Sequence, residues 1–182
     1  MSCDGISDVH THNPKADTRC SVRNLTMDEL PVWLEGKAHG YFSAGIHPWD
    51  AHLTPALDLI ASAANDPRLW AIGECGLDKN ATADMERQMA LFEPQIELAL
   101  THDKHLIIHC VKAWDELIAL YKKHHKKNEK CMWIVHGFRG NSQLASQLLK
   151  LGFKLSINYK RKDELLQRLP IADYFFETDE DY

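Results

Sequence analysis

The sequence predicts an α/β protein that folds as a TIM-like (β/α)8 barrel, distorted because its first and final helices are missing or shortened. Short apolar segments alternate with helical segments at intervals of roughly thirty residues, which is the pattern of βαβ units in a parallel sheet. There are eight apolar segments, a number that favours a closed barrel over an open sheet. Several of them end at a histidine or a carboxylate, and the carboxyl ends of barrel strands all face one mouth, where active sites lie.

The expected strands are apolar runs bounded by glycine, proline or polar residues. They cover residues 6–12, 19–25, 41–46, 69–74, 106–109, 132–136, 153–157 and 174–178. The fourth lies within WAIGECGLD at residues 70–78, where an apolar run changes abruptly to a carboxylate between two glycines. Because glycine lets the backbone turn sharply, we expect this strand to end there and to present Glu74 at its C-terminal end.

Helices are expected at residues 27–34, 54–64, 82–102, 114–124, 141–151 and 162–169. Proline in the first turn marks the start of the second, and Leu91, Ile96 and Leu100 contribute to an apolar face of the third. Asn141 and the following serine cap the fifth, and Gly152 ends it. The first two strands leave no room for a helix between them, and nothing remains after Asp179 to form an eighth helix.

Composition indicates an ordinary soluble globular protein. The 182 residues, 45% hydrophobic and 26% charged, suit one well-filled core, so we expect a single domain over residues 1–182. A net charge of -5 argues against a general nucleic-acid coat. The N-terminus has no signal-peptide pattern, no apolar run approaches a membrane span, and the five cysteines form no CxxC pair. We therefore expect a cytoplasmic protein with reduced thiols and no membrane partner.

Metal-type ligands recur at the ends of the expected strands. They are His10 and His12 on the first strand, His47 after the third, Glu74 on the fourth, His109 on the fifth, His136 on the sixth and Asp179 after the eighth. The spacing of two puts His10 and His12 on the same side of their strand. A single histidine at a strand end is more often structural, but six such coincidences at one topological position indicate a site. Imidazole and carboxylate together suit zinc, manganese or related divalent ions.

Six ligands are too many for one catalytic ion that keeps an open position. Two divalent ions, Zn, Mg or Mn, fit better if Glu74 bridges them. His10, His12 and Asp179 would complete one site, and His109 and His136 the other. Such a pair, about 3.5–4 Å apart, stabilises the attacking and leaving oxygens of an in-line displacement and activates a water. Asp179 is placed to take the proton of that water, so we expect Glu74 and Asp179 to be catalytic.

These residues fall in sequence blocks that resemble the TatD family of metal-dependent deoxyribonucleases. The blocks are DVHTH at residues 8–12, GIHPWD at 45–50, GECGLD at 73–78, IIHC at 107–110, VHGF at 135–138 and ETD at 177–179. The resemblance covers nearly the whole chain in the right order. It implies a metal-dependent phosphodiesterase that hydrolyses DNA in a TIM-like barrel, with the six ligands as assigned above. It also implies that His47 works at the active site on substrate rather than on metal.

The chain departs from the family pattern in two places. Family members usually have more sequence between the first two blocks and a helical segment after ETD, whereas this chain ends at Tyr182. The residues that follow ETD also differ from the usual ones. The resemblance therefore does not determine the mouth of the barrel near Asp179.

Basic residues in the connections after the strands are candidates to contact phosphate. They are Lys15, Lys79, Lys112, Arg139 and Arg161, and Arg139 is the foremost because a guanidinium can hold a phosphate through two bonds. The basic run at residues 122–127 ends a helix on the opposite face of the barrel, so we expect a solvated helix end rather than a DNA contact. Trp49 and Phe138 are expected to pack in the core or at the rim, with base stacking as the alternative.

Two further functions are consistent with the same residues. One is another metal-dependent hydrolase, acting on a cyclic amide as amidohydrolases do, or on a small phosphoester. Amidohydrolases commonly bridge their ions with a carboxylated lysine on the fourth strand, and Lys79 lies too far past that strand's expected end. The other is a metal-binding barrel without catalysis, although it would be expected to lose some ligands. The residues leave open DNA against RNA, exonuclease against endonuclease action, the metal and the oligomeric state.

Overall fold

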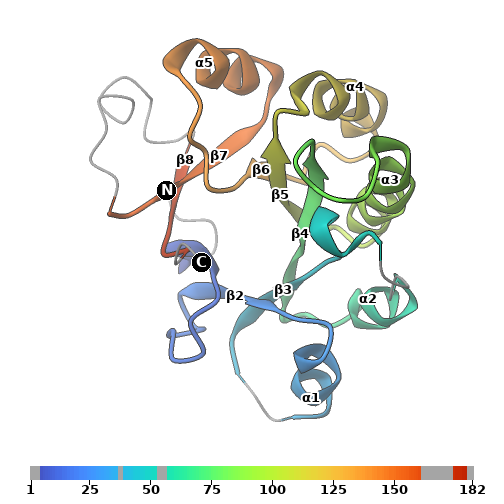
Figure 1. The fold of residues 1–182 in the computed structure, drawn as a ribbon. Coiled ribbons are helices and arrows are strands. Elements are labelled where there is room, and N and C mark those ends of the chain that lie inside the picture. The colour runs from blue at the N-terminus through green and yellow to red at the C-terminus, as the bar shows by residue number, and fades with distance from the viewer. Residues whose placement is uncertain (1–4, 37–38, 53–56, 161–173, 180–182) are drawn as a thin grey trace.

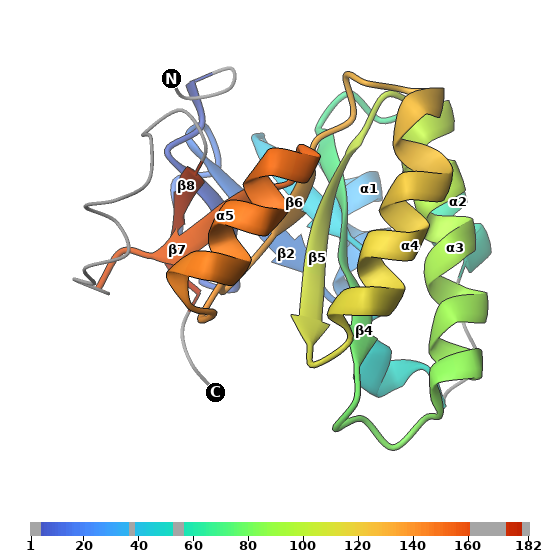
Figure 2. The same cartoon turned by 90° about the horizontal axis from the view of Figure 1, so that it is seen from above.

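The computed structural model describes residues 5–36, 39–52, 57–160 and 174–179. These residues form the predicted barrel: eight parallel strands in one sheet, hydrogen-bonded in chain order. Helices lie on the outside of the strands (Figure 1), and Figure 2 shows α3, α4 and α5 covering β4 to β7 from the side. The strands are β1 (Asp8–Thr11), β2 (Ser21–Leu25), β3 (Tyr41–Ala44), β4 (Leu69–Asp78), β5 (His105–Val111), β6 (Trp133–Val135), β7 (Lys154–Asn158) and β8 (Tyr174–Glu177).

The expected helices within the described residues are present. They are α1 (Glu29–Glu35), α2 (Leu57–Ala63), α3 (Met85–Thr101), α4 (Trp114–His124) and α5 (Ser142–Leu151), with 3-10 turns η2 (Pro48–Asp50) and η3 (His125–Lys127). The Asn141 side chain caps α5 by accepting a hydrogen bond from the Leu144 N–H, and Gly152 ends it at a φ of 109°. No helix occurs between β1 and β2, as expected. The expected helix at 162–169 and the chain after Asp179 lie outside the described residues.

The expected end of the fourth strand is wrong. Strand β4 continues past Glu74 to Asp78 and pairs with β5 up to Asp78 and Val111, after an irregularity between Ile72 and Cys75. The glycine read as a turn is instead a point of close approach, since a Cβ on Gly76 would lie 2.0 Å from the His109 carbonyl oxygen. Glu74 therefore lies inside a long strand, with backbone pairing on both sides of it.

An apolar layer fills the barrel beneath the site. Ile6, Val9, Val22, Trp70, Ala71, Ile107 and Ile134 pack together there, separately from the larger core between strands and helices. On β5 this layer is two residues before His109, so alternation of side chains puts Ile107 on the same face as the histidine. A buried, packed layer of this kind fixes the side chains that lie on it.

Strands β1 and β8 meet through side chains at the point where the barrel closes. The Thr178 hydroxyl donates to Asp8 Oδ2 at 2.5 Å and lies 3.0 Å from the Thr11 hydroxyl, while the Thr178 N–H donates to Asp8 Oδ1 at 3.2 Å. Asp8 is 9% exposed, and its burial raises the pKa of its carboxyl, an effect that the hydrogen bonds from Thr178 and the His10 N–H oppose. The closure therefore depends on a buried acid that needs its donors.

Replacing Thr178 by valine is expected to lower the free energy of unfolding by about 1–2 kcal/mol. Valine keeps the shape but removes the hydroxyl donor, which leaves the buried Asp8 carboxylate one hydrogen bond short. Urea denaturation measures the change, and Thr178→Ser, which keeps the hydroxyl, is the matched control. Equal stability of the valine and serine variants would show that this hydrogen bond does not hold β1 to β8.

Candidate metal centre

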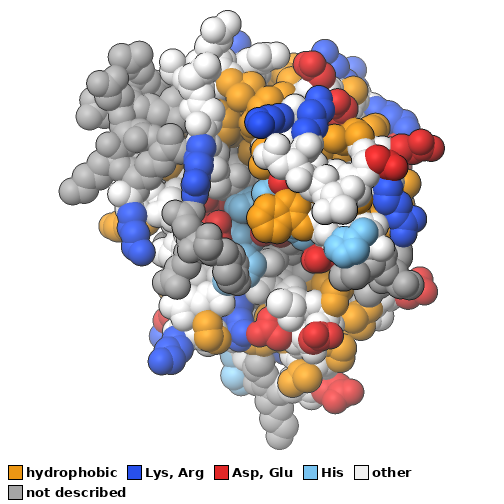
Figure 3. Space-filling view, viewed as in Figure 1, with side chains coloured by type: hydrophobic (Ala, Val, Ile, Leu, Met, Phe, Trp, Pro, Cys, Tyr) orange, Lys and Arg blue, Asp and Glu red, His pale blue; other side chains and the backbone are white. Residues whose placement is uncertain are grey.

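A cavity of about 1000 Å³ opens at the C-terminal ends of the strands. Figure 3 shows histidine side chains gathered in a hollow near the centre of this face. Six of the seven predicted site residues line the cavity: His12, His47, Glu74, His109, His136 and Asp179. The seventh, His10, is fully buried. The structure thus brings residues from six different strands to one point.

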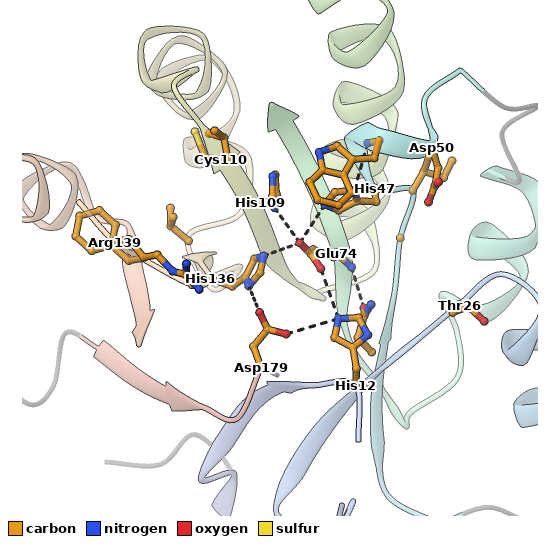
Figure 4. Close-up of a pocket in the computed structure, with 18 of the residues that line it drawn as sticks. His12, Thr26, His47, Asp50, Glu74, His109, Cys110, His136, Arg139 and Asp179 are labelled. Carbon is orange, nitrogen blue, oxygen red and sulfur yellow. Dashed lines mark hydrogen bonds and ion pairs between the residues drawn. The ribbon is translucent and has the colours of Figure 1, made fainter. Parts of the chain in front are cut away.

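Glu74 lies at the centre of the histidines (Figure 4). Its Oε1 atom is 2.6 Å from His136 Nε2, 3.0 Å from His109 Nδ1 and 3.2 Å from His47 Nε2. Its Oε2 atom is 3.5 Å from His10 Nε2 and 3.8 Å from His12 Nε2. Asp179 Oδ1 is 3.8 Å from each of the latter two nitrogens. The two carboxylate oxygens of Glu74 therefore have different nearest imidazoles.

The donor atoms around His10 and His12 are spaced as ligands of a shared cation would be. His10, His12 and Asp179 offer ligand atoms within 4.8 Å of one another, and so do the group of Glu74 with His10 and His136 and the group of Glu74 with His47 and His109. Metal bonds of about 2.0–2.1 Å at tetrahedral angles separate two ligand atoms by about 3.3 Å. The 3.5–3.8 Å separations around His10 and His12 are too long for hydrogen bonds but close to this value.

His10 gives independent support for a cation. Both of its ring nitrogens are buried and make no hydrogen bond to the part of the chain that the structure describes. Burial and the neighbouring His136 hold the pKa of His10 well below 6.5, against the pull of Glu74, so the ring is neutral with a lone pair to donate. A buried polar group without a partner is costly, and a divalent cation held with Glu74 and Asp179 would satisfy it. The residues present fit such an ion.

Glu74 and His136 stabilise each other's charged forms when no cation is bound. Burial acts to raise the pKa of Glu74, but His136, His109 and His12 hold it well below 4.5. Burial acts in the opposite sense on His136, yet the charge and hydrogen bond of Glu74, with Glu177 and Asp179, raise its pKa to about 9. Glu74 and His136 thus form a carboxylate–imidazolium pair in the metal-free protein.

The tautomer of His47 follows from its neighbour. Its Nδ1 accepts a hydrogen bond from the Trp49 backbone N–H at 3.2 Å, so in the neutral ring the hydrogen sits on Nε2. That Nε2 points at Glu74 Oε1. A ring arranged in this way presents a hydrogen-bond donor to the centre.

Other side chains support the centre, and Asn24 among them was not predicted from the sequence. Asn24 Oδ1 on β2 accepts from the Glu74 N–H at 2.9 Å and from the Ser43 hydroxyl at 2.9 Å. Glu177 accepts from the Ser156 hydroxyl at 2.6 Å and the Gly137 N–H at 2.8 Å, and its Oε2 is 3.9 Å from His136 Nδ1. In the sequence, these residues stand out only as polar residues within apolar strands. That pattern does not show which residues they contact.

Two buried glutamines of α3 fix the backbone of the site. Gln95 accepts from the Ile46 N–H at 2.7 Å and donates to the Ile46 carbonyl, immediately before His47. Gln88 accepts from the Asp78 N–H at 2.7 Å and donates to the Asp78 carbonyl at 2.9 Å. They are two helical turns apart and lie on the buried face of α3. In the sequence, the available indication of their role is that they are polar residues at apolar positions of the helix.

The predicted phosphate contacts divide into two groups. Arg139 and Lys112 line the cavity, and the Lys112 Nζ also donates to Asn80 Oδ1 at 3.3 Å. Lys79 and Lys15 are not among the lining residues, and the Lys79 Nζ is 2.8 Å from Glu116 Oε1. Arg161 lies outside the described residues. In the basic run at 122–127, Lys123 pairs with Glu93 and Lys127 with Glu97, which is what a solvated helix end does.

Comparison with known proteins agrees with this geometry. A family model described as TatD related DNase matches residues 18–182. An Escherichia coli protein named uncharacterized metal-dependent hydrolase YjjV is 30% identical over 151 residues, 76% of this chain and 57% of that protein. A Klebsiella pneumoniae protein named 3'-5' ssDNA/RNA exonuclease TatD is 32% identical, over 77% of this chain and 57% of that protein. The chain thus spans little more than half the length of these two relatives.

Solved structures give the same fold. The crystal structure of the E. coli TatD homologue YjjV superposes with a TM-score of 0.76 at 25% identity, covering 98% of this chain and 80% of that one. A TatD family hydrolase from Entamoeba histolytica superposes with a TM-score of 0.70 at 19% identity, covering 97% and 74%. With the family match over most of its length, this chain belongs to the TatD-related DNase family.

Proposed function

We propose that the chain is a metal-dependent phosphodiesterase that hydrolyses the phosphodiester bonds of DNA with two divalent cations. The observation that carries the proposal is the Glu74 carboxylate, whose two oxygens have different nearest imidazoles: His136 and His109 for Oε1, His10 and His12 for Oε2. A bridging carboxylate between two cations is the arrangement of many phosphoryl-transfer sites. Because β1 supplies His10 and β8 leads to Asp179, residues from both ends of the chain serve one centre, which supports a single catalytic domain over residues 1–182.

The residues divide into two sets around Glu74. His10, His12, Asp179 and Glu74 would hold the first cation, and His109, His136 and Glu74 would hold the second. Bound cations would lower the pKa of a coordinated water and offset the charge on the phosphoryl oxygens. Asp179, which faces the first set, would accept the proton of the attacking water.

Two further side chains hold the phosphate. His47 directs its Nε2–H towards the centre, where it donates to a phosphoryl oxygen. Arg139 lines the same cavity and binds the phosphate through its planar guanidinium. Lys112 adds positive charge at the rim. In this assignment His47 binds substrate rather than metal. The assignment agrees with its tautomer, because the hydrogen bond from the Trp49 N–H to Nδ1 leaves the ring hydrogen on Nε2.

The names of relatives support a nucleic-acid substrate. Besides the Klebsiella protein, a human protein named 3'-5' RNA nuclease TATDN2 is 30% identical over 183 residues, 93% of this chain and 23% of that protein. An amide-hydrolysing alternative has less support, because Lys79 is paired with Glu116 away from the centre. A small phosphoester is tested alongside DNA and RNA below.

Metal-stripped protein is reloaded with Mg²⁺, Mn²⁺ or Zn²⁺ and given four substrates: single-stranded DNA, RNA of the same sequence, a simple phosphodiester and a cyclic amide. We expect metal-dependent hydrolysis of the DNA oligonucleotide and none of the amide. A parallel preparation of Glu74→Gln controls for contaminating nucleases. Hydrolysis of the amide alone, or no metal-dependent turnover of any phosphodiester, would overturn the proposed function.

A further inference from the structure

Trp49 is an exposed aromatic residue at the rim of the cavity. It lies in η2 after β3, is 57% exposed, and with Val32 and Tyr159 is one of three large hydrophobic residues exposed within the described parts of the chain. Of these three it is the one that lines the cavity. Phe138 and Trp114 also line the cavity, but Phe138 is 2% exposed and packs against Trp114, with ring centroids 6.2 Å apart. Trp49 therefore offers a free ring face at the mouth, and Phe138 does not.

The exposed indole is held in place by polar contacts. Its Nε1–H donates to Asp78 Oδ2 at 2.7 Å, and its backbone N–H donates to His47 Nδ1 at 3.2 Å. Its ring meets the His47 ring edge-on, with centroids 5.0 Å apart. A hydrogen bond to a carboxylate is stronger than one between neutral groups. A large apolar ring that is fixed yet exposed is pre-organised for a partner with an apolar face.

The same carboxylate oxygen also holds a residue of the metal centre. Asp78 Oδ2 is 3.0 Å from His109 Nε2, while His109 Nδ1 faces Glu74 Oε1 at 3.0 Å. Acceptance of the Nε2–H by Asp78 leaves the Nδ1 lone pair directed at the centre. Asp78 is itself fixed through its backbone by Gln88. One buried acid thus orients both the exposed ring and a metal-facing imidazole.

We propose that Trp49 is the stacking platform for the base next to the scissile phosphate, and that Asp78 is the positioning residue that couples this platform to His109. This inference rests on the proposed function and names the part of the substrate that the rim binds. Bases stack on aromatic rings with little regard to sequence, because every base has a π face. The platform therefore selects nucleic acid over phosphodiesters without bases, rather than one base over another.

The test compares a thymidine oligonucleotide with the abasic deoxyribose oligomer of the same length, with Mn²⁺ present. For wild-type protein, kcat/KM is higher on the thymidine oligomer. In Trp49→Leu this preference falls about 10- to 100-fold, mainly through KM, because one base-stacking contact is lost. Trp49→Phe, which keeps a ring without the N–H, retains part of the preference. Tyr159→Leu, an exposed aromatic outside the cavity lining, keeps the wild-type preference and is the matched control.

Asp78→Asn separates the coupling from the stacking. It is expected to reduce the preference and also to weaken Mn²⁺ binding about 10- to 100-fold, as loss of a group that orients a metal-binding histidine does. Trp49→Leu lacks the second effect. A wild-type preference retained in Trp49→Leu, or one lost equally in Tyr159→Leu, would overturn the platform while leaving the nuclease function in place. Failure of the wild-type protein to hydrolyse either oligomer would overturn the proposed function and the platform together.

Discussion

Replacing Glu74 by glutamine is expected to reduce metal-dependent phosphodiester hydrolysis by at least about 10³-fold. The two carboxylate oxygens of Glu74 lie 2.6–3.8 Å from imidazoles of both sets, and an amide cannot supply two anionic oxygens. Loss of the shared ligand removes several kcal/mol of charge stabilisation, and about 4 kcal/mol corresponds to three decades in rate. Turnover of a single-stranded oligonucleotide measures the change.

Metal content gives a second measurement of the same variant. The wild-type protein is expected to bind two divalent ions per chain, and Glu74→Gln at most one, when counted by elemental analysis after dialysis. Glu97→Gln is the matched control, because Glu97 is a carboxylate of α3 that pairs with Lys127 outside the cavity lining. Circular dichroism checks that the fold is retained. Full activity in Glu74→Gln with two ions bound would contradict the bridging role.

The barrel was predictable because its evidence is local. Apolar runs at regular intervals, the Asn141 cap and the Gly152 stop each act within a few residues of chain, and all of them are found in the structure. The end of the fourth strand was not predictable in this way. A glycine beside Glu74 has the same signature in a sharp turn and in a strand that passes close to its neighbour. The neighbour that decides between them, His109, lies 33 residues after Gly76 in the chain.

The same distinction between local and distant evidence applies to the site. Its histidines and acids could be grouped from sequence, because the carboxyl ends of parallel strands meet at one mouth whatever their separation in the chain. The side chains that hold these histidines and acids in place could not be predicted from sequence. Asn24 contacts the Glu74 backbone across 50 residues of sequence, and Gln95 contacts Ile46 across 49. The separate outcomes of Trp49 and Phe138, one exposed and one buried, likewise depend on packing between loops that no local pattern records.

Cation binding to the metal-free protein is expected to release about one proton per chain at pH 7.5. In that state the pKa of His136 is raised to about 9, since its pairing with Glu74 outweighs its burial. A histidine must be neutral to bind a metal, so the imidazolium has to lose its proton. Apparent affinity therefore rises about tenfold per pH unit and levels off near pH 9. Calorimetric titration with Mn²⁺ in two buffers of different ionisation enthalpy counts the proton, and a buffer-independent heat would contradict the pairing.

The same pairing predicts opposite pH trends for the two states of the protein. A folded-state pKa above the unfolded value of about 6.5 stabilises the protein fully below pH 6.5, and this stabilisation is lost as the pH rises through 9. The loss is on the order of 3 kcal/mol for a shift of this size. Cation binding adds stability that grows with affinity, and so with pH over the same interval. The increase in Tm on adding Mn²⁺ should therefore widen from pH 6.5 to 9. In His136→Gln, which has no proton to lose in this pH range, the increase in Tm on adding Mn²⁺ should grow less between pH 6.5 and 9. An equal growth in both proteins would assign the effect to another group.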